Sequence, residues 1–156
     1  MSSILEIHIA KSGVSAPQKL QAAELVAGKG IVGDSYYKKM AGYSDNLSGL
    51  PAKELTLIES EEIDLFNKSY GFSFSYRDFR RDIVTRGARL NELVGKEFML
   101  GDIRLRGISL CEPCAHLENL LAAELMPSLA NKTGLSAEII STGSIAVGDS
   151  IASHPN

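Results

Sequence analysis

Short apolar segments that end in Gly-Asp recur along this chain of 156 residues. The stretches GIVGD, FMLGD and IAVGD place the dipeptide at Gly33-Asp34, Gly101-Asp102 and Gly148-Asp149. Glycine adopts a positive φ without strain and aspartate bonds its own backbone, so each dipeptide predicts a turn. The unequal spacing argues against a repeat array. A chain interrupted in this way is restricted to short secondary-structure elements.

The apolar patterns between the turns predict mainly strands. Alternation in ILEIHIA puts Ile4 and His8 on one face of a strand and Ile7 on the other. We expect roughly eight or nine short strands and two or three helices. The clearest segments are strands over 4–10 and 54–60, a helix over 60–70 capped by Ser60 and ended by Gly71, a hairpin over 96–111, a helix over 116–125 and two strands over 137–153. Without a regular βα alternation, this predicts a mostly β domain with attached helices (α+β), barrel-like or sandwich-like.

Composition limits the class of protein. The length fits a single domain over 1–156, and the apolar runs are too short to cross a membrane. The N-terminus lacks the basic and apolar regions of a signal peptide, so we expect a cytoplasmic protein. The net charge of −3 argues against a nucleic-acid partner.

The arginines are confined to one part of the chain. All seven lie between residues 77 and 106, whereas the nine lysines are scattered. Because a guanidinium group suits phosphate and carboxylate, this region could form an anion site. Surface ion pairs with neighbouring acids are an equally good explanation. The preceding aromatic stretch, YGFSFSY (70–76), is better explained by packing than by base stacking.

Both cysteines of the chain lie in the stretch LCEPCAH, at Cys111 and Cys114, with His116 two residues further on. A closed zinc site needs four ligands, and this stretch supplies three. A thioredoxin-like pair needs a βαβ setting, which the hairpins do not match. A reversible disulfide between the two cysteines, and Cys111 as a small buried apolar residue, both stay open.

Cys114 is the better candidate for chemistry. It follows Pro113, where a strand is expected to end and a helix to begin. The positive end of a helix dipole lowers the pKa of a thiol. A thiolate in that position would be a nucleophile and a soft metal ligand.

Several segments together resemble the MOSC domain family, named after the C-terminal domain of molybdenum-cofactor sulfurases. In chain order they are GKGIVGDSYY (28–37), LTLIESE (55–61), RRDIVTRGARLNELVGKEFMLGD (80–102), LRGISLCEPCAHL (105–117) and GLSAEIISTGSIAVGD (134–149). The resemblance covers most of the chain and is to a stand-alone member, without the pyridoxal-phosphate desulfurase domain of the full-length sulfurases.

The resemblance implies a β-barrel-like fold and a function for Cys114. Family members are thought to carry sulfur on this cysteine or to bind the molybdenum cofactor (molybdopterin), with the cysteine sulfur as a ligand of molybdenum. The cofactor-binding residues it implies are Arg80, Arg81, Asp82, Thr85, Arg86 and Asp34. Asp34 also fits a simple turn. Two positions depart from the family pattern, because Asp82 stands where asparagine is usual and Ser35 where arginine is usual.

Three functions follow as hypotheses. The first is a sulfur carrier or cofactor-binding module that works with a cysteine desulfurase or another protein of the molybdenum-cofactor pathway. The second is a molybdenum-dependent reductase of N-hydroxylated compounds, which would need a separate redox partner. The third is a non-catalytic module regulated by a Cys111–Cys114 disulfide. The sequence therefore leaves open whether the protein is an oxidoreductase, a sulfur transferase or not an enzyme.

Overall fold

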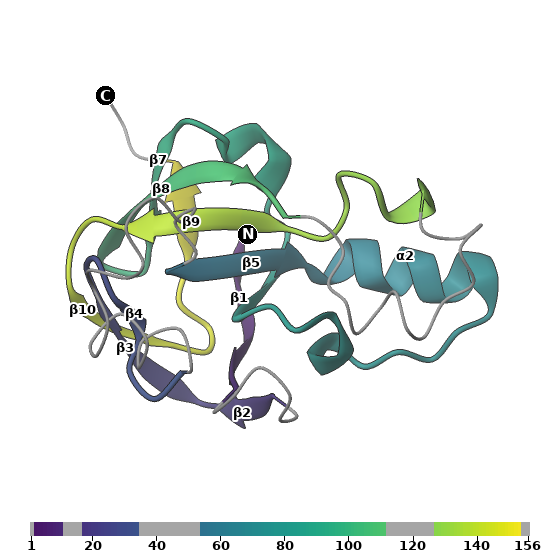
Figure 1. Cartoon of the computed structure of the whole chain (residues 1–156), viewed down its shortest axis with the longest axis horizontal. Coiled ribbons are helices and arrows are strands. Elements are labelled where there is room, and N and C mark those ends of the chain that lie inside the picture. The colour runs from purple at the N-terminus through teal and green to yellow at the C-terminus, as the bar shows by residue number, and fades with distance from the viewer. Residues whose placement is uncertain (1, 11–16, 35–53, 112–126, 154–156) are drawn as a thin grey trace, which may run out of the picture.

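The structure is a computed structural model that describes residues 2–10, 17–34, 54–111 and 127–153. It is mostly β, as the sequence predicts (Figure 1). In chain order the strands within these ranges are β1 (Ser3–Ile9), β2 (Gln18–Leu20), β3 (Ala22–Val26), β4 (Gly30–Ile31), β5 (Leu55–Glu59), β6 (Ile83–Arg86), β7 (Glu97–Leu100), β8 (Ile103–Leu110), β9 (Leu135–Ile139), β10 (Gly143–Ala146) and β11 (Ile151–Ser153). The helices are α2 (Ser60–Tyr70) and the 3-10 helices η2 (Tyr76–Phe79) and η3 (Leu90–Leu93).

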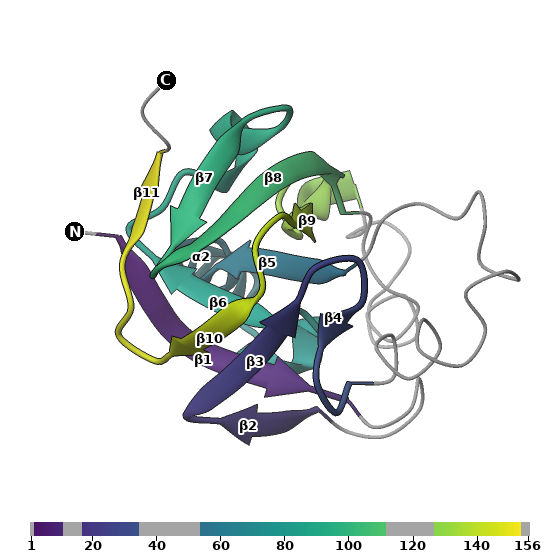
Figure 2. The same cartoon turned by 90° about the vertical axis from the view of Figure 1, so that its left-hand side faces the viewer.

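The strands form two sheets that curl around one core. The larger sheet has the order β11-β7-β8-β9-β5-β6-β1-β2, and the smaller has the order β10-β3-β4. Figure 2 shows the large sheet curving like half a barrel, with β10, β3 and β4 across its open side. The start of β1 lies beside the start of β11, where Ile4 N donates to Asp149 O at 2.9 Å. The fold is therefore barrel-like rather than a flat sandwich.

Each face of the large sheet packs against its own apolar cluster. The inner cluster holds residues from nearly every strand, including the fully buried Leu57, Ile83 and Leu135. The outer cluster lies beneath α2 and includes Ile58, Ile63 and Val84. Full burial of one such side chain stabilises a fold by about 1.5–3 kcal/mol, so the outer cluster holds α2 against the sheet.

The expected face alternation of the first strand is wrong at its start. Ile4 and Ile7 both lie in the inner core, because the pairing of β1 with β6 shifts register between Ile4 and Glu6. Such a bulge inserts one residue and changes the face of those before it. After the bulge, Glu6 and His8 point away from the inner core.

The helix and turn predictions hold with one small change. The N-cap position of helix α2 is Glu59 rather than Ser60 and makes no side-chain capping hydrogen bond, and the helix ends at Gly71, which has the left-handed φ of 73°. The hairpin of β7 and β8 turns at Gly101-Asp102 and pairs Leu100 with Ile103. The helix expected over 116–125 lies outside the described residues.

The aromatic stretch packs, as expected, rather than forming an open face. Phe72 and Phe74 stack on Phe66 of α2, and Phe74 meets Phe79 edge to face at 6.1 Å between ring centroids. The Tyr76 hydroxyl donates to Asp64 of α2 at 2.9 Å. Among the residues that the structure describes, no helix is long and apolar enough to cross a membrane.

Candidate functional site

A row of polar residues crosses one end of the large sheet. Strand registers pair Ile7 with Ile83 and Leu57 with both Ile83 and Leu135, and these residues all face the inner core. Their neighbours one step along lie on the opposite face, since side chains alternate in strands. This step gives the cross-strand row His8, Asp82, Thr56 and Ser136. Such polar residues within an apolar sheet mark a candidate site.

Asp82 is held from two sides at the centre of this row. Its Oδ2 accepts hydrogen bonds from Thr56 N at 2.8 Å and Thr56 Oγ1 at 3.1 Å. Its backbone N–H donates to Thr56 Oγ1 at 3.0 Å, and its carbonyl accepts from His8 N at 2.6 Å. The carboxyl group therefore has a fixed position at the start of β6, beside β5 and β1.

Asp34 brings a second carboxylate to the same edge of β1. Its Oδ1 accepts from Ala10 N at 2.9 Å. His8 N and Ala10 N lie on the same side of β1, about 7 Å apart, because successive residues alternate. Asp34 Oδ1 thus accepts the hydrogen bond from β1 that lies next to the one accepted by Asp82 O. In a longer β6, a backbone carbonyl would occupy this position. A Gly-Asp turn distant in sequence supplies part of the site.

The charge of Asp34 affects the titration of Asp82. Asp82 keeps some exposed surface, but the protein around its carboxyl group excludes most of the water. This burial raises the pKa of Asp82 to about 7, and the negative charge of Asp34 adds to the rise. The hydrogen bonds from Thr56 and the charge of Arg81 act in the opposite direction. Asp82 can therefore hold or release a proton near neutral pH.

Arg81 is buried beside this pair and is only 8% exposed. Its Nε donates to the carbonyl of Thr133 at 2.6 Å. A buried guanidinium group is costly unless it is hydrogen-bonded, and this short charge-assisted bond provides one partner. At least this part of the side chain is committed to the protein rather than to a ligand.

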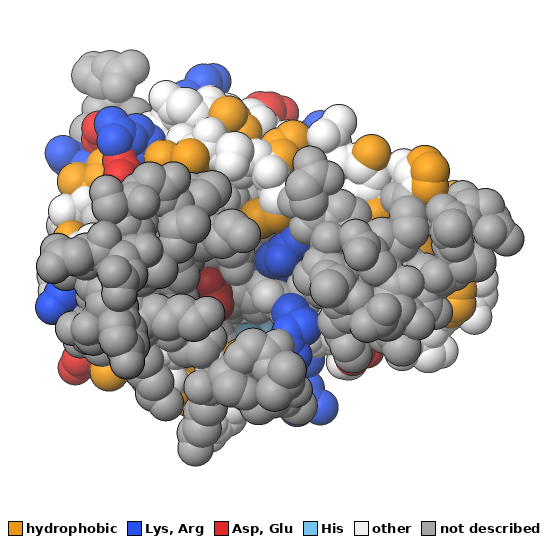
Figure 3. All heavy atoms as spheres, in the orientation of Figure 1, with side chains coloured by type: hydrophobic (Ala, Val, Ile, Leu, Met, Phe, Trp, Pro, Cys, Tyr) orange, Lys and Arg blue, Asp and Glu red, His pale blue; other side chains and the backbone are white. Residues whose placement is uncertain are grey.

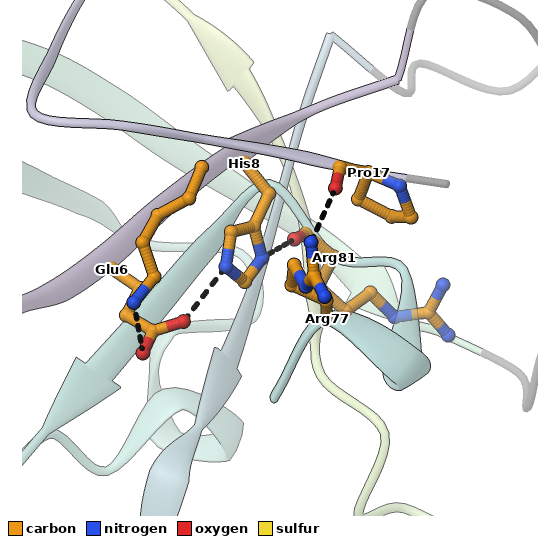
Figure 4. A network of polar contacts seen from close by, with 6 residues as sticks. Glu6, His8, Pro17, Arg77 and Arg81 are labelled. Carbon is orange, nitrogen blue, oxygen red and sulfur yellow. Dashed lines mark hydrogen bonds and ion pairs between the residues drawn. The ribbon is translucent and has the colours of Figure 1, made fainter. Parts of the chain in front are cut away.

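The His8 side chain contacts the backbone of Arg81. It is 1% exposed, and its Nδ1 lies 3.3 Å from Arg81 O while its Nε2 lies 2.8 Å from Glu6 Oε1 (Figure 4). Glu6 also pairs with Lys19 at 3.4 Å. Both ring nitrogens of His8 therefore have polar partners, and the ring lies next to the backbone of Arg81.

Hydrogen bonds connect the site to the end of β8. Thr133 is fully buried, and its Oγ1 donates to Cys111 O at 2.9 Å. Cys111 N in turn donates to Gly134 O at 2.8 Å. Arg81, Thr133 and Cys111 thus form a continuous link, which ends three positions before Cys114 in the sequence. Cys114 itself, like Pro113 and His116, lies outside the described residues.

The other expected site residues are placed as follows. Arg80 ends η2 with a left-handed φ of 57°, directly before Arg81. Thr85 is fully buried and donates to Ile58 O at 3.3 Å. Arg86 is exposed at the far end of β6, about 13 Å from Asp82 along the strand. The structure brings Asp34, Arg81 and Asp82 together, with Arg80 next to Arg81 in the chain, and it separates Thr85 and Arg86 from them.

Three other arginines of the cluster do not converge on this site. Arg89, Arg104 and Arg106 pair with Glu92, Glu97 and Glu138, respectively. Exposed ion pairs of this kind contribute little to stability. For these three residues, the explanation by surface ion pairs is the one that holds.

Figure 3 shows basic, acidic and histidine side chains meeting in a hollow on one face of the molecule. Among the described residues, no group of three or more histidine, cysteine, aspartate or glutamate side chains could hold a metal ion.

Sequence reasoning missed Thr56 and Thr133. Thr56 is the one polar residue between apolar neighbours in ELTLI, and this break in the pattern was the only available signal. Thr133 lies in a turn and carries no signal, because its role depends on a contact 52 residues away.

Comparison with known proteins identifies the family. The family model described as MOSC domain matches residues 44–152. The chain belongs to the MOSC domain family. This family is associated with the molybdenum cofactor in general terms. A comparison with curated protein sequences gave no match.

Solved structures share the fold of this MOSC protein at low sequence identity. The YuaD protein from Bacillus subtilis is 16% identical with a TM-score of 0.78, over 99% of this chain and 98% of that one. YiiM from Geobacillus stearothermophilus is 14% identical with a TM-score of 0.74, over 99% and 76% of the two chains. YiiM from Escherichia coli is 15% identical with a TM-score of 0.69, over 100% and 71%. At these identities the likeness shows the fold alone.

Arg81 and Asp82 are not arranged to bind the phosphate of a phosphorylated pterin cofactor. Arg81 directs its Nε at a backbone carbonyl, and the carboxyl groups of Asp34 and Asp82 lie beside it. Carboxylates at this position oppose the binding of a dianion, because like charges repel. The departure at position 82 from the usual asparagine strengthens this mismatch. We therefore assign no step to the cofactor.

Proposed function

We propose that this MOSC protein carries sulfur on Cys114 as a persulfide, received from a cysteine desulfurase or another protein of the molybdenum-cofactor pathway. The proposal is supported chiefly by the link from Arg81 through Thr133 to Cys111. This link connects the buried Arg81 side chain to the residue that follows β8, and Cys114 comes three positions later in the sequence. A cation near a cysteine favours the thiolate, which is the reactive form.

The proposed transfer balances without an oxidant. The Cys114 thiolate attacks the outer sulfur of the donor's persulfide, and a bond forms between that sulfur and Sγ of Cys114. The S–S bond of the donor breaks, and the donor leaves as a thiolate. Cys114 then carries the terminal sulfur to an acceptor by the same exchange in reverse.

The experiment is transfer of labelled sulfur from a cysteine desulfurase with labelled cysteine. Wild-type protein and the Cys111→Ser variant are expected to take up about one sulfur per chain, and Cys114→Ser to take up none. Cys111→Ser is the matched control, because it removes the other thiol of the same stretch. Uptake by Cys114→Ser equal to wild type would show that the carrier proposal is wrong.

A reductase of N-hydroxylated compounds is the second candidate, and Asp82 favours it. Reduction of such a compound breaks the N–O bond, consumes two electrons and two protons, and releases the oxygen as water. The electrons would come from a separate redox protein. Asp82, with a pKa raised to about 7, could supply one of the protons at neutral pH.

Metal analysis separates the two candidates. Protein purified from a host that makes the molybdenum cofactor would contain stoichiometric molybdenum and pterin if Cys114 is a metal ligand, and Cys114→Ser would lose both. Absence of molybdenum from the wild type would remove the reductase and leave the sulfur carrier.

A further inference from the structure

We propose that the cavity at the C-terminal ends of β5 and β6 binds a small organic ammonium ion. The cavity has a volume of about 600 Å³, which is within the range of small-molecule sites in proteins. It lies at the opposite end of β6 from Asp82, and none of the described residues that line it belongs to the polar row. This site is independent of the sulfur chemistry proposed for Cys114.

Three segments of the chain enclose the cavity. Strands β5 and β6 run parallel, so both end at the same edge of the sheet. One wall comes from Glu59 at the end of β5 and from the first turn of α2, and another comes from residues 87–92 after β6. The turn before β9 adds residues 130–132 and Gly134. The cavity thus depends on the same strand pairing as the rest of the sheet.

The charges around the cavity favour a cation. Its described lining contains four glutamates, one arginine and one lysine: Glu59, Glu61, Glu62, Glu92, Arg89 and Lys132. Arg89 is itself paired with Glu92, at 3.9 Å between Nε and Oε2. The three glutamates where β5 meets α2 therefore leave a surplus of negative charge. Such a surplus in a partly enclosed space raises the local concentration of cations.

Glu62 has an unsatisfied carboxylate oxygen. Among the described residues, its Oε2 is the one buried side-chain oxygen or nitrogen atom without a hydrogen-bond partner. Buried polar atoms in native proteins nearly always have a partner, and an unsatisfied one is costly. Glu61 and Glu59, by contrast, accept backbone hydrogen bonds from Gly87 N at 2.7 Å and Leu90 N at 3.1 Å. An ammonium group, which carries only donors, is the type of ligand that a free carboxylate oxygen binds.

The titration of Glu59 shows that the three carboxylates are close enough to interact. Burial raises the pKa of Glu59, and the negative charges of Glu62 and Glu61 add to the rise, while the hydrogen bond from Leu90 N opposes it. A bound cation would favour the ionised form of each carboxylate. Binding is therefore linked to proton release, and the affinity for an ammonium ion should increase as the pH rises.

The size and lining of the cavity favour an organic cation over a single metal ion. Mg²⁺ and Ca²⁺ hold their oxygen ligands at about 2.0–2.6 Å and occupy little space. This cavity, in contrast, is as large as the sites of ligands with many atoms. Ala88 and Leu90 line it and are both buried, so they offer apolar surface to the carbon atoms of a ligand. An alkylamine has both the charge and the apolar chain.

The test uses 1,4-diaminobutane, with 1,4-butanediol as the uncharged analogue of the same length and Mg²⁺ as a metal ion of the same charge. Binding to the full chain is followed by amide chemical shifts in NMR spectra and by calorimetry. Glu62→Gln and Glu59→Gln each remove one charge from the cavity. Glu24→Gln is the matched control, because it removes an exposed glutamate from β3.

We expect 1,4-diaminobutane to shift the amide signals of Gly87 and Leu90 and to leave that of Thr56 unchanged. Glu62→Gln and Glu59→Gln should each weaken binding by on the order of tenfold, because each removes a close opposite charge. Glu24→Gln should bind like wild type. The wild-type affinity should increase from about pH 5 to about pH 8, as the carboxylates lose their protons.

Equal weakening by all three variants would overturn the proposal, because it would show attraction to the overall negative charge. Equal binding of 1,4-butanediol, preferred binding of Mg²⁺ at the same amides, or the lack of any saturable shift would also overturn it. If Glu59→Gln does not fold, Glu62→Gln and Glu24→Gln decide. The amine test involves no sulfur donor, so failure of sulfur uptake by Cys114 would leave it intact.

Discussion

The two ends of strand β6 differ in their hydrogen bonds and in their exposure to solvent. At its start, Asp82 bonds Thr56 across to β5, and Arg81 reaches the turn before β9. At its finish, Thr85 is buried against Ile58 O and Arg86 points to solvent. Residues following Arg86 line a cavity of about 600 Å³, together with glutamates of β5 and α2. This cavity lies at the opposite end of β6 from the polar row.

The two ends of β6 differ in which elements their side-chain hydrogen bonds connect. Glu59 and Glu61 at the cavity end accept bonds from the backbone N–H groups of Leu90 and Gly87. Those bonds fix the loop after β6. At the start of β6, by contrast, side chains join three strands and a turn, and an ionisable carboxyl group lies among them. Substitutions at the two ends should therefore have unequal effects.

The largest effect is expected for Gly134→Ala. The new Cβ would lie 2.1 Å from Leu57 O, and the residue has a φ of +111°. We expect a loss of roughly 3 kcal/mol or more in the free energy of unfolding, measured by urea titration. Gly95→Ala is the control, because Gly95 has a positive φ of +77° but open space around it. It should lose only about 1 kcal/mol, and equal losses would contradict the packing argument.

The second prediction compares the losses in the free energy of unfolding when threonines on two neighbouring strands are replaced by valine. Thr56→Val removes the hydroxyl that donates to Asp82 Oδ2 and accepts from Asp82 N. Thr85→Val removes one longer bond, to Ile58 O. We expect losses of about 2 and about 1 kcal/mol, respectively, from thermal or urea unfolding. A larger loss for Thr85→Val would reverse the ranking of the two ends.

Much of this organisation could be predicted from the sequence, and the rest could not for physical reasons. The short strands, the Gly71 stop and the Gly101-Asp102 turn follow from local preferences, and the structure confirms them. The bulge between Ile4 and Glu6 could not be predicted, because it is set by pairing with β6.

In the candidate site, too, some features could be predicted from the sequence and others could not. Asp34, Arg81 and Asp82 were expected from the family resemblance, and the structure brings them together. The commitment of Arg81 to Thr133 could not be expected, because it depends on how distant turns meet. Sequence patterns identify residue types that could form a site, and the fold decides which partners they find.

Asp82→Asn should change how stability depends on pH. Because the pKa of Asp82 is raised to about 7, the folded protein holds a proton that the unfolded chain releases near pH 4. The stabilisation is complete below about pH 4 and is lost as the pH rises through about 7, with a slope of at most about 1.4 kcal/mol per pH unit. Burial also raises the pKa values of Glu54 and Glu59, and their contributions remain in both proteins. The difference between the two unfolding curves therefore isolates Asp82, and parallel curves would show that it titrates normally.

The smallest effect is expected for Arg86→Gln, at the far end of β6. Its side chain is exposed, and substitutions at such positions usually change stability by less than about 0.5 kcal/mol. The measurement is the urea midpoint at neutral pH. A loss as large as that of Thr56→Val would show that the two ends of the strand are equally important.

The separation in sequence of the bonded partners also determines when the site can form during folding. The bonds to Arg81 and Asp82 join residues 26, 52 and 73 positions apart. No local helix or hairpin contains the set, so these bonds can form only after β1, β5, β6 and the turn before β9 have come together. The amide protons of Thr56 and His8 should accordingly exchange with solvent only through global unfolding, the slowest class of exchange. A chain whose sheet is incomplete at any of these elements would have no site.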